Sequence, residues 1–357
     1  MSSNLSPEEI LKQKEMQSGI KFDDPEDLVS TETSSSELEN KEPQIQKEVI
    51  QQEQAIAKSS VTQQDSLLDQ SEIRKALGGP SGWKNLPIAL LPSKGIFYPE
   101  GTRIAIRSAE VKEIRHFSTI DDDDRLDIEE KLGFILDQCM IMEFPGDGVM
   151  NFNYLKSEDR FFVIMAIRDL TFTKGENMIV LYPEEKCTKE SNECPIGNGF
   201  ELRTGVLSSY ELDEKIMKYY SDSERCFVFK PKKINKEIRM WIPSIGVARR
   251  ISEFVIYCSK NSIEIDDSFV QIAPFLFDDW KKINVDIILQ KLKESDTWTK
   301  EEFSLCFELS EKIKIGTKGK ARVSCPKCGA KEVTANITFP EGVRSLFVIS
   351  DIFGELL

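Results

Sequence analysis

Two cysteines on one predicted turn near the C-terminus are the most specific chemical signal in this sequence. They lie in Cys325-Pro326-Lys327-Cys328-Gly329, where two intervening residues let both thiolates face the same metal ion. A glycine at position 329 suits the point where the backbone must turn back. Such a knuckle supplies only half of a tetrahedral zinc site, so two further ligands are needed.

The remaining ligands would be Cys187 and Cys194, the only other close pair of cysteines in polar, turn-like surroundings. Four thiolates leave no open position for water, so the predicted zinc is structural rather than catalytic. Two alternatives stay open. The pair has a wide spacing for a single knuckle, and Gly197 stands where a second knuckle cysteine would follow Cys194. The pattern could therefore be a decayed knuckle without metal. A thioredoxin-like redox role would need a βαβ unit around the motif, and none is predicted.

Catalytic residues are not predicted anywhere in the chain. His116 is the only histidine, and it has no nucleophile motif beside it, so we expect a helix-surface or partly buried side chain. The sequence contains no nucleophile elbow, P-loop or dinucleotide-binding glycine motif. Four consecutive acids at 121–124 could suggest a cation site. Calcium loops, however, interleave their acids with other residues, so a helix N-terminus is the better interpretation. The sequence thus predicts a protein that is not an enzyme.

The charge balance disfavours general binding to nucleic acid. The formal net charge is −14 at pH 7, whereas nucleic-acid binding needs positive charge to displace counterions from phosphates. A basic stretch at 312–322, directly before the knuckle, keeps one alternative open: a zinc-ribbon nucleic-acid-binding protein. No aromatic residue interleaves with its lysines for base stacking. We therefore expect no nucleic acid among the partners.

Hydropathy predicts no membrane span, because no stretch approaches about 18 consecutive apolar residues. The N-terminal residues lack the apolar core of a secretory signal. We therefore expect a reducing cytoplasm, where the eight cysteines are thiols or metal ligands rather than disulfides.

Residues 1–80 differ in composition from the rest of the chain. They contain 16 Asp and Glu against 8 Lys and Arg, and Phe22 is their only aromatic residue. Such a segment buries too little apolar surface to offset the entropy lost on ordering, so we expect a disordered acidic arm. An alternative is a short binding segment near its end. Its apolar residues would be Leu67, Leu68, Ile73 and Leu77.

The remaining sequence predicts an α+β fold with a helical core, short β modules and the CPKCG knuckle. We expect an N-terminal half at 81–245, which includes the first cysteine turn, and a helical half at 246–357, which ends in the knuckle module. Ser157 is a plausible N-cap, and Thr299 with Glu302 has capping-box spacing. Helices are predicted at 108–119, after 124, and at 158–170, 246–260, 266–277, 285–293 and 299–313. Strands are predicted at 103–107, 178–182, 226–230, 237–242 and within 322–339.

Two longer motifs resemble a known family. One is LPSKG-x-x-Y, which comprises Leu91-Pro92-Ser93-Lys94-Gly95 and Tyr98; the other is Arg168-Asp169-Leu170-Thr171. Together with the acidic run, the cysteine-bearing turns and the closing FVISDIFGEL, they make residues 86–357 similar to the baseplate hub proteins of large contractile-tailed (myovirus) bacteriophages. The arm lies outside this similarity.

The resemblance implies a hub component or a hub assembly chaperone that acts through protein–protein contacts. The implied partners are the phage baseplate hub proteins, with the tape-measure protein as a further candidate. The implied location is the host cytoplasm, or the virion tail for a component that stays in the particle. Relatives carry cysteine knuckles in both halves, so the departure at Gly197 implies the loss of one cysteine.

Overall fold

A computed structural model describes residues 82–173, 178–184, 195–231, 236–325, 327–339 and 342–347. These residues belong to one compact unit, Leu67–Leu357. The predicted arm lies outside the described residues, as do Cys187 and Cys194. The predictions made for them are therefore untested by the fold.

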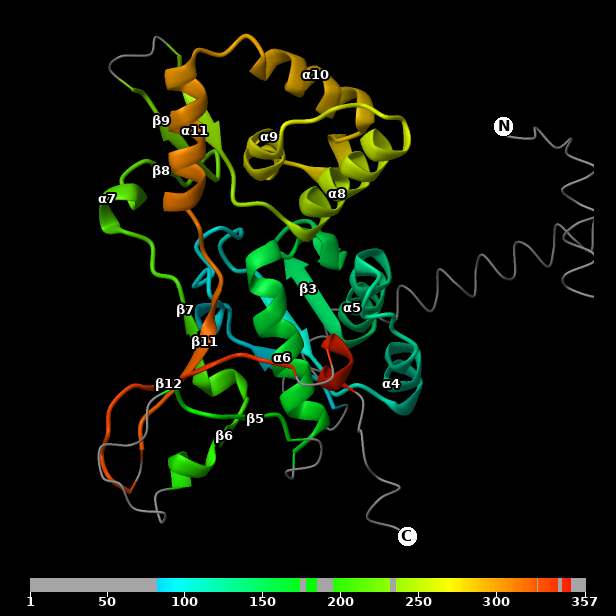
Figure 1. The fold of residues 1–357 in the computed structure, drawn as a ribbon, viewed down its shortest axis with the longest axis vertical. Coiled ribbons are helices and arrows are strands. Elements are labelled where there is room, and N and C mark those ends of the chain that lie inside the picture. The colour runs from blue at the N-terminus through cyan, green and yellow to red at the C-terminus, as the bar shows by residue number, and fades with distance from the viewer. Residues whose placement is uncertain are drawn as a thin grey trace, which may run out of the picture. The chain divides into compact units, whose positions relative to one another are not determined.

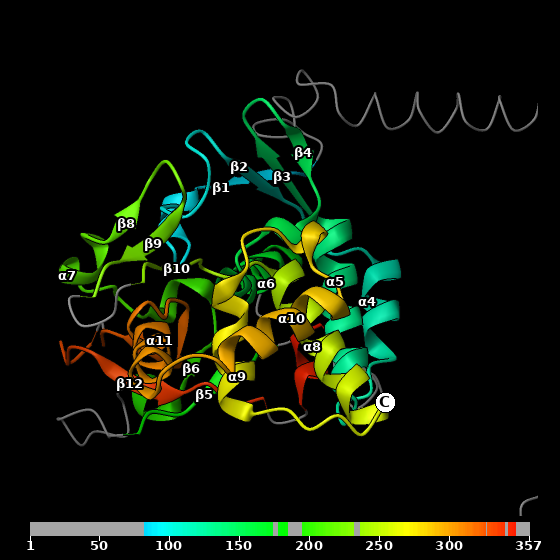
Figure 2. The ribbon, with the colours of Figure 1, turned by 90° about the horizontal axis from the view of Figure 1, so that it is seen from above.

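A four-stranded antiparallel sheet forms the first part of the unit (Figures 1 and 2). Of its strands, only the one at Arg103–Ile106 was predicted from the sequence, at 103–107. In β3, Met140, Met142 and Phe144 are buried and alternate with half-buried residues, as a sheet with one covered face requires. In spatial order the strands are β1 (Lys84–Leu86), β2 (Arg103–Ile106), β3 (Met140–Phe144) and β4 (Gly148–Met150).

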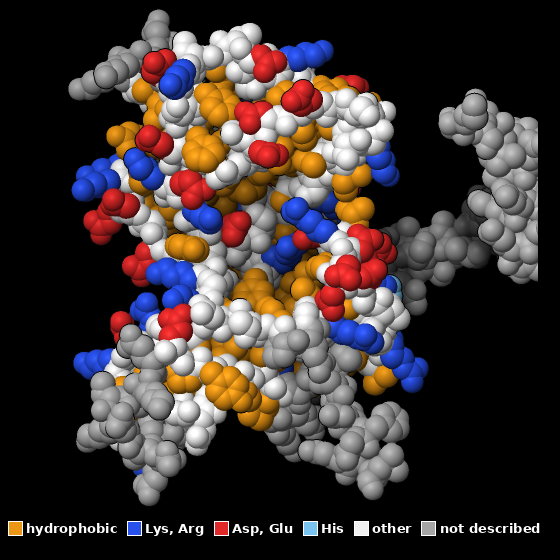
Figure 3. Space-filling view, in the orientation of Figure 1, with side chains coloured by type: hydrophobic (Ala, Val, Ile, Leu, Met, Phe, Trp, Pro, Cys, Tyr) orange, Lys and Arg blue, Asp and Glu red, His pale blue; other side chains and the backbone are white. Residues whose placement is uncertain are grey.

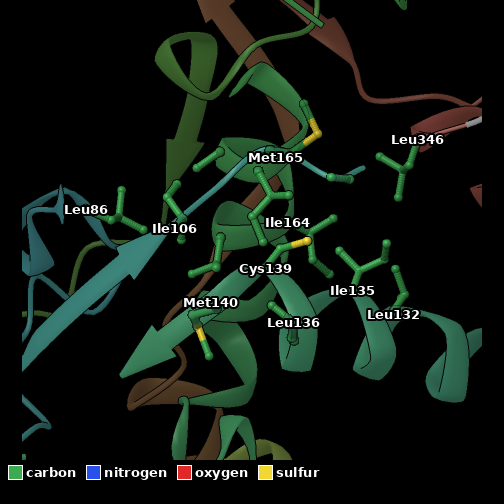
Figure 4. Packing of buried hydrophobic residues seen from close by; sticks show 14 of the residues in the cluster. Leu86, Ile106, Leu132, Ile135, Leu136, Cys139, Met140, Ile164, Met165 and Leu346 are labelled. Atoms are coloured by element: carbon green, nitrogen blue, oxygen red, sulfur yellow. The ribbon is translucent and has the colours of Figure 1, made fainter. Parts of the chain in front are cut away.

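Three helices bury the largest apolar cluster against this sheet. They are α4 (Val111–Ser118), α5 (Arg125–Cys139) and α6 (Arg160–Thr171). Asp124, the last residue of the acidic run, caps α5 by accepting a hydrogen bond from the Leu126 amide, which confirms the predicted helix start. Figure 4 shows Leu132, Ile135 and Leu136 of α5 gathered with Ile164 and Met165 of α6.

The prediction that Ser157 caps the third helix is wrong. A short 3-10 turn precedes α6, and the Ser157 hydroxyl donates instead to the Pro243 carbonyl, 86 residues away. Asp159 is the residue before the helix, but its side chain makes no capping hydrogen bond because it is used elsewhere.

A second core lies around a three-stranded sheet with the strand order β10-β9-β8. Phe227, Phe229 and Met240 are buried there against the helix that runs down to the C-terminal module. The strands predicted at 226–230 and 237–242 are present and pair antiparallel, and the predicted capping box of Thr299 and Glu302 is confirmed. The elements are α7 (Glu214–Met217), β8 (Tyr220–Ser221), β9 (Cys226–Phe229), β10 (Ile238–Met240) and α11 (Lys300–Lys312).

Three helices enclose the third core, as expected from their apolar spacing. Figure 1 shows α8 (Ile245–Lys260), α9 (Asp267–Ile272) and α10 (Val285–Ser295) together at the top of the view. Ile251, Phe254 and Cys258 lie on the buried side of α8. A Cβ atom at Gly246 would lie 2.4 Å from Cγ of Trp280, so only glycine fits this contact.

The C-terminal module returns to the first core. Strand β11 pairs with β12 and also with β7 from the first predicted half. Ala321, Ala335, Leu346 and Phe347 belong to the same apolar cluster as α5 and α6. The remaining strands are β5 (Val180–Leu181), β6 (Phe200–Glu201), β7 (Leu207–Ser209), β11 (Thr317–Val323) and β12 (Val333–Asn336).

Short 3-10 helices complete the described elements. They are η1 (Ile88–Leu90), η2 (Phe152–Tyr154), η3 (Ser157–Asp159), η4 (Pro195–Asn198), η5 (Thr204–Val206), η6 (Ala273–Leu276), η7 (Trp280–Lys282) and η8 (Val343–Leu346). The mixture of helices and short sheets confirms the α+β class. Within the described ranges, no helix has the length and apolar character to cross a bilayer.

Candidate functional site

The CPKCG motif forms the tight turn that its sequence predicts. The Cys325 amide donates to the Ala330 carbonyl at 2.9 Å, and the Gly329 amide donates back to the Cys325 carbonyl at 3.1 Å. Gly329 has φ +68°, in the left-handed region that favours glycine. Cys325 is buried and Cys328 is half-buried, so the described part of the predicted zinc site is a folded turn with both cysteines in one small cluster.

The cluster around this knuckle includes a residue from the other cysteine region. Ile196 is buried in the same small apolar cluster as Cys325, and Ile196 follows Cys194 by two residues in the sequence. The segment that directly follows Cys194 in the sequence therefore packs against the turn that carries Cys325 and Cys328. Within the described part of the chain, no three Cys, His, Asp or Glu side chains gather to hold a metal. A zinc ion would need the two cysteines that lie outside it.

A buried carboxylate organises the first of the two family-like motifs. Asp159 accepts hydrogen bonds from the Ser93 amide (2.9 Å) and from the Tyr98 hydroxyl (2.7 Å). The same hydroxyl accepts from the Lys156 amide at 2.9 Å. We call these four residues the Asp159 clamp. Burial raises the pKa of Asp159, while the hydrogen bonds from Ser93 and Tyr98 act in the opposite direction.

The clamp holds the LPSKG-x-x-Y loop in an unusual conformation. Lys94 has φ +53° and Gly95 has φ +78°. A Cβ atom at position 95 would lie 2.8 Å from Cδ1 of Ile88, so glycine is required by space as well as by φ. In this motif, Ser93, Gly95 and Tyr98 thus have structural roles in fixing the loop to the start of α6.

Next to the clamp, the chain forms its connection to α8. The Lys156 ammonium donates to the Ile242 carbonyl at 3.1 Å, and the Ser157 amide donates to the Pro243 carbonyl at 3.0 Å. Burial lowers the pKa of Lys156 to about 8; nearby Asp159 raises it and Arg225 lowers it further. The clamp and the entry to α8 therefore form one continuous hydrogen-bonded network.

The second motif, Arg168 to Thr171, is also held from distant segments. Asp169 accepts from the amide (2.9 Å) and the hydroxyl (2.7 Å) of Thr204, and its carboxylate lies 3.5 Å from the Arg203 guanidinium. The Thr171 hydroxyl accepts from the Ala109 amide at 2.9 Å. Arg168 is fully buried, with its guanidinium 5.5 Å from the centre of the Phe172 ring. This motif too contributes to the fold of the first core.

A large open groove lies between α5 and α8. Its volume is about 1280 Å³, and Figure 3 shows apolar side chains within the hollow and charged side chains around it. We call it the α5–α8 groove. Its half-buried apolar residues are Phe134, Phe152, Phe161, Ile256, Val270 and Phe275.

Charged pairs flank the α5–α8 groove on both helices. Arg160 forms a bidentate pair with Glu129 beside α5, and Arg249 pairs with Glu253 on α8 at 3.1 Å. Leu126, at the start of α5, leaves 50% of its surface exposed at the groove. An apolar floor with a charged rim is typical of surfaces that bind an amphipathic helix.

The predicted helical position of His116 is confirmed. It lies on α4, half-buried, with its ring centre 4.1 Å from that of Phe134 at the edge of the groove.

An aromatic residue from a distant part of the sequence lies beside the basic stretch at 312–322. Tyr210, which is 41% exposed, lies under two ammonium groups: Lys314 at 6.0 Å and Lys318 at 5.7 Å from its ring centre. Two other cations of the stretch are paired, Lys320 with Glu184 and Arg322 with Glu332. No signal in the sequence placed Tyr210 here, because β7 reaches β11 only through the fold.

Comparison with known proteins gives no match to a protein-family model, to a curated protein or to a solved structure. The functional argument therefore rests on the residues themselves.

Proposed function

We propose that the protein assembles the baseplate hub of a contractile phage tail, as a hub component or as a chaperone of the hub, through protein–protein contacts in the host cytoplasm. The α5–α8 groove is the observation that carries this proposal, because it offers a partner an apolar floor and a charged rim. The two family-like motifs add support, since their hydrogen bonds hold both ends of α6, which packs against α5.

Co-purification from infected cells tests this function. A tagged chain should enrich hub or tape-measure proteins, identified by mass spectrometry. Leu126→Arg places a charge at the groove and should reduce that enrichment. Val111→Arg is the matched control, since Val111 is also exposed (64%) but does not line the groove. Enrichment of no tail protein, or equal loss with both variants, would contradict the proposal. Presence or absence in purified particles then separates a component from a chaperone.

The zinc site is a second part of this proposal. Zinc suits a four-thiolate donor set, and the described knuckle supplies two cysteines on a turn with the required left-handed glycine. Ile196, two positions after Cys194 in the sequence, lies in the Cys325 cluster, and this supports a site shared by the two cysteine pairs. Bound zinc would supply only structural cross-linking. Cys325 and Cys328 would hold it from the C-terminal module, and Cys187 and Cys194 from the first half.

Nucleic-acid binding is the competing function, and one observation favours it: Tyr210 between Lys314 and Lys318 combines a ring with two cations. Anisotropy with labelled single-stranded DNA and RNA decides the matter. We expect no binding at micromolar concentration in about 150 mM salt, because the chain's charge of −14 opposes it. Salt-sensitive binding that is lost in Tyr210→Ala, but kept in the exposed control Tyr257→Ala, would favour this alternative.

A further inference from the structure

Residues of two hairpins line a second cleft in the fold. Figure 2 shows the β3–β4 hairpin and the β8–β9 hairpin on the same side of the molecule. Together with the loop after η1 and with η7 they surround a cleft of about 770 Å³, which we call the hairpin cleft. It shares no lining residue with the α5–α8 groove among those that the structure describes. The hairpin cleft is therefore a separate candidate site.

Three cationic side chains line the hairpin cleft, each from a different element. Lys156 lies between η2 and η3, Arg225 lies in the turn between β8 and β9, and Lys281 lies in η7. Within the described ranges, none of the three forms an ion pair with a carboxylate. The whole chain carries a net charge of −14, so this local group of cations is opposite in sign to the protein as a whole.

The carboxylates of the hairpin cleft do not neutralise these cations. Glu224 pairs with Arg239 at 3.0 Å and Asp278 pairs with Lys282 at 3.3 Å, both with cations from outside the cleft lining. Asp147, in the exposed turn of the β3–β4 hairpin, is the one remaining carboxylate among the described lining residues. The cleft therefore has an excess of positive charge and favours an anion.

Lys156 is held in place at the cleft by its neighbours. Its amide donates to the Tyr98 hydroxyl, and its ammonium donates to the Ile242 carbonyl at 3.1 Å. An ammonium has three donors, so two remain for a ligand. Burial lowers the pKa of Lys156 to about 8; Asp159 acts in the opposite direction, and Arg225 lowers this pKa further. A bound anion would offset the repulsion between Lys156 and Arg225.

Arg225 has a backbone conformation that arginine rarely adopts. Its φ is +51°, in the left-handed region, at the last position of the β8–β9 turn. Glycine, asparagine and aspartate are the usual residues with this conformation, because it costs stability for a residue with a Cβ atom. Such outliers cluster where a ligand is held. An anion-binding role accounts for a guanidinium at this position of the turn.

The aromatic side chains of the hairpin cleft add a second kind of contact. Tyr154 and Trp280 are half-buried there, with ring centres 6.0 Å apart, and the Lys281 ammonium lies 5.2 Å from the centre of the Tyr154 ring. Nε1 of Trp280 is buried and has no hydrogen-bond partner in the described part of the chain. An oxygen of a ligand at this wall would satisfy that donor.

We propose that the hairpin cleft binds the phosphate group of a small molecule through Lys156, Arg225 and Lys281. A phosphate carries nearly two negative charges at neutral pH, so it matches this excess of cations better than a single carboxylate does. Two sources share this chemistry. A free polyphosphate would be held by the cations alone, whereas the base of a nucleotide would also lie against the aromatic wall. This inference does not rest on the proposed function.

Isothermal titration calorimetry of the purified full-length protein tests this proposal. The probes are ATP, tripolyphosphate and adenosine in magnesium-free buffer. We expect a phosphate-bearing probe to bind one site per chain, and adenosine not to bind at the same concentrations. Tighter binding of ATP than of tripolyphosphate assigns the site to a nucleotide, and binding of tripolyphosphate at least as tight as that of ATP assigns it to a free polyphosphate.

Substitutions at exposed positions show whether the hairpin cleft is the site. Arg225→Gln and Lys281→Gln should each weaken binding about ten-fold, the size expected for one charge-assisted contact. Lys260→Gln is the matched control, because it removes the same charge from an exposed residue in the last turn of α8, outside the cleft lining. It should leave the affinity unchanged. Circular dichroism checks that each variant is folded.

Protection of the wild-type chain gives a readout that needs no variant. Bound ATP should slow the acetylation of Lys281 by an amine-reactive ester, relative to that of Lys260, as measured by mass spectrometry. No binding of either phosphate probe at millimolar concentration, or binding of adenosine alone, would overturn the proposal. The same affinity in all three variants, or equal acetylation of Lys281 with and without ATP, would also overturn it.

Discussion

Replacing Tyr98 by phenylalanine removes the one hydroxyl that joins both sides of the Asp159 clamp. In the native protein this hydroxyl donates to Asp159 at 2.7 Å and accepts from the Lys156 amide at 2.9 Å. The variant leaves a buried carboxylate oxygen and a backbone amide each without this partner. A hydrogen bond to a charged group contributes about 1.5–3 kcal/mol and a neutral one about 1 kcal/mol. We therefore expect the free energy of unfolding to fall by about 3 kcal/mol.

Urea unfolding monitored by circular dichroism measures this loss, and the melting temperature should fall by roughly 6–12 °C. Tyr220→Phe is the matched control. Its hydroxyl makes a single long contact of 3.4 Å to the Ile96 carbonyl near the surface, so the loss should stay below about 0.5 kcal/mol. If Tyr98→Phe also costs less than about 1 kcal/mol, the clamp does not hold the loop and the reasoning is wrong.

The dependence of this loss on pH provides a second check. Burial raises the pKa of folded Asp159 above its unfolded value, so the stability associated with its bound proton is lost as pH rises through the folded pKa. Without the Tyr98 hydroxyl the carboxylate is less stabilised and that pKa rises further. The stability gap between wild type and Tyr98→Phe should therefore widen with rising pH. A constant gap would show that Asp159 is not the partner that matters.

Three further predictions concern other parts of the chain. Elemental analysis should find about one zinc per chain; Cys328→Ser should lower zinc content and melting temperature, and Cys187→Ser must do the same if the site is shared. Limited proteolysis followed by mass spectrometry should cut first within 1–80, because its composition buries little apolar surface; protection of this arm in the isolated protein would contradict that. Gly246→Ala should lower the free energy of unfolding by about 1–3 kcal/mol, because its Cβ would lie 2.4 Å from Cγ of Trp280; a neutral effect in urea unfolding would mean that Trp280 can move aside.

Local signals explain which elements could be predicted from the sequence. Asp124 at the end of the acidic run caps α5, and Thr299 with Glu302 forms the capping box of α11, because each acts on backbone groups within one turn. The glycine of the CPKCG turn was predicted for the same reason: Gly329 meets a local demand for a left-handed backbone.

Strands β3 and β4 were missed because their signal depends on a neighbour. Strand β3 starts at Met140, directly after the last residue of α5, with no turn residue between them. Its apolar alternation spans only five residues and becomes a strand through pairing with β2. Ser157 was misassigned for a related reason: its hydroxyl finds the Pro243 carbonyl, a partner that exists only after α8 has packed.

The sequence alone determined the mixed helix-and-strand class of the fold, the starts of α5 and α11 and the turn at CPKCG, since periodicity and turn chemistry act over a few residues. Tertiary structure decided what the motifs do. Tyr98 meets Asp159 across 61 residues, and Tyr210 reaches Lys314 from a different strand. The α5–α8 groove likewise exists only because two distant helices face each other. Such contacts depend on how the chain folds back on itself, and no local pattern of residues carries that information.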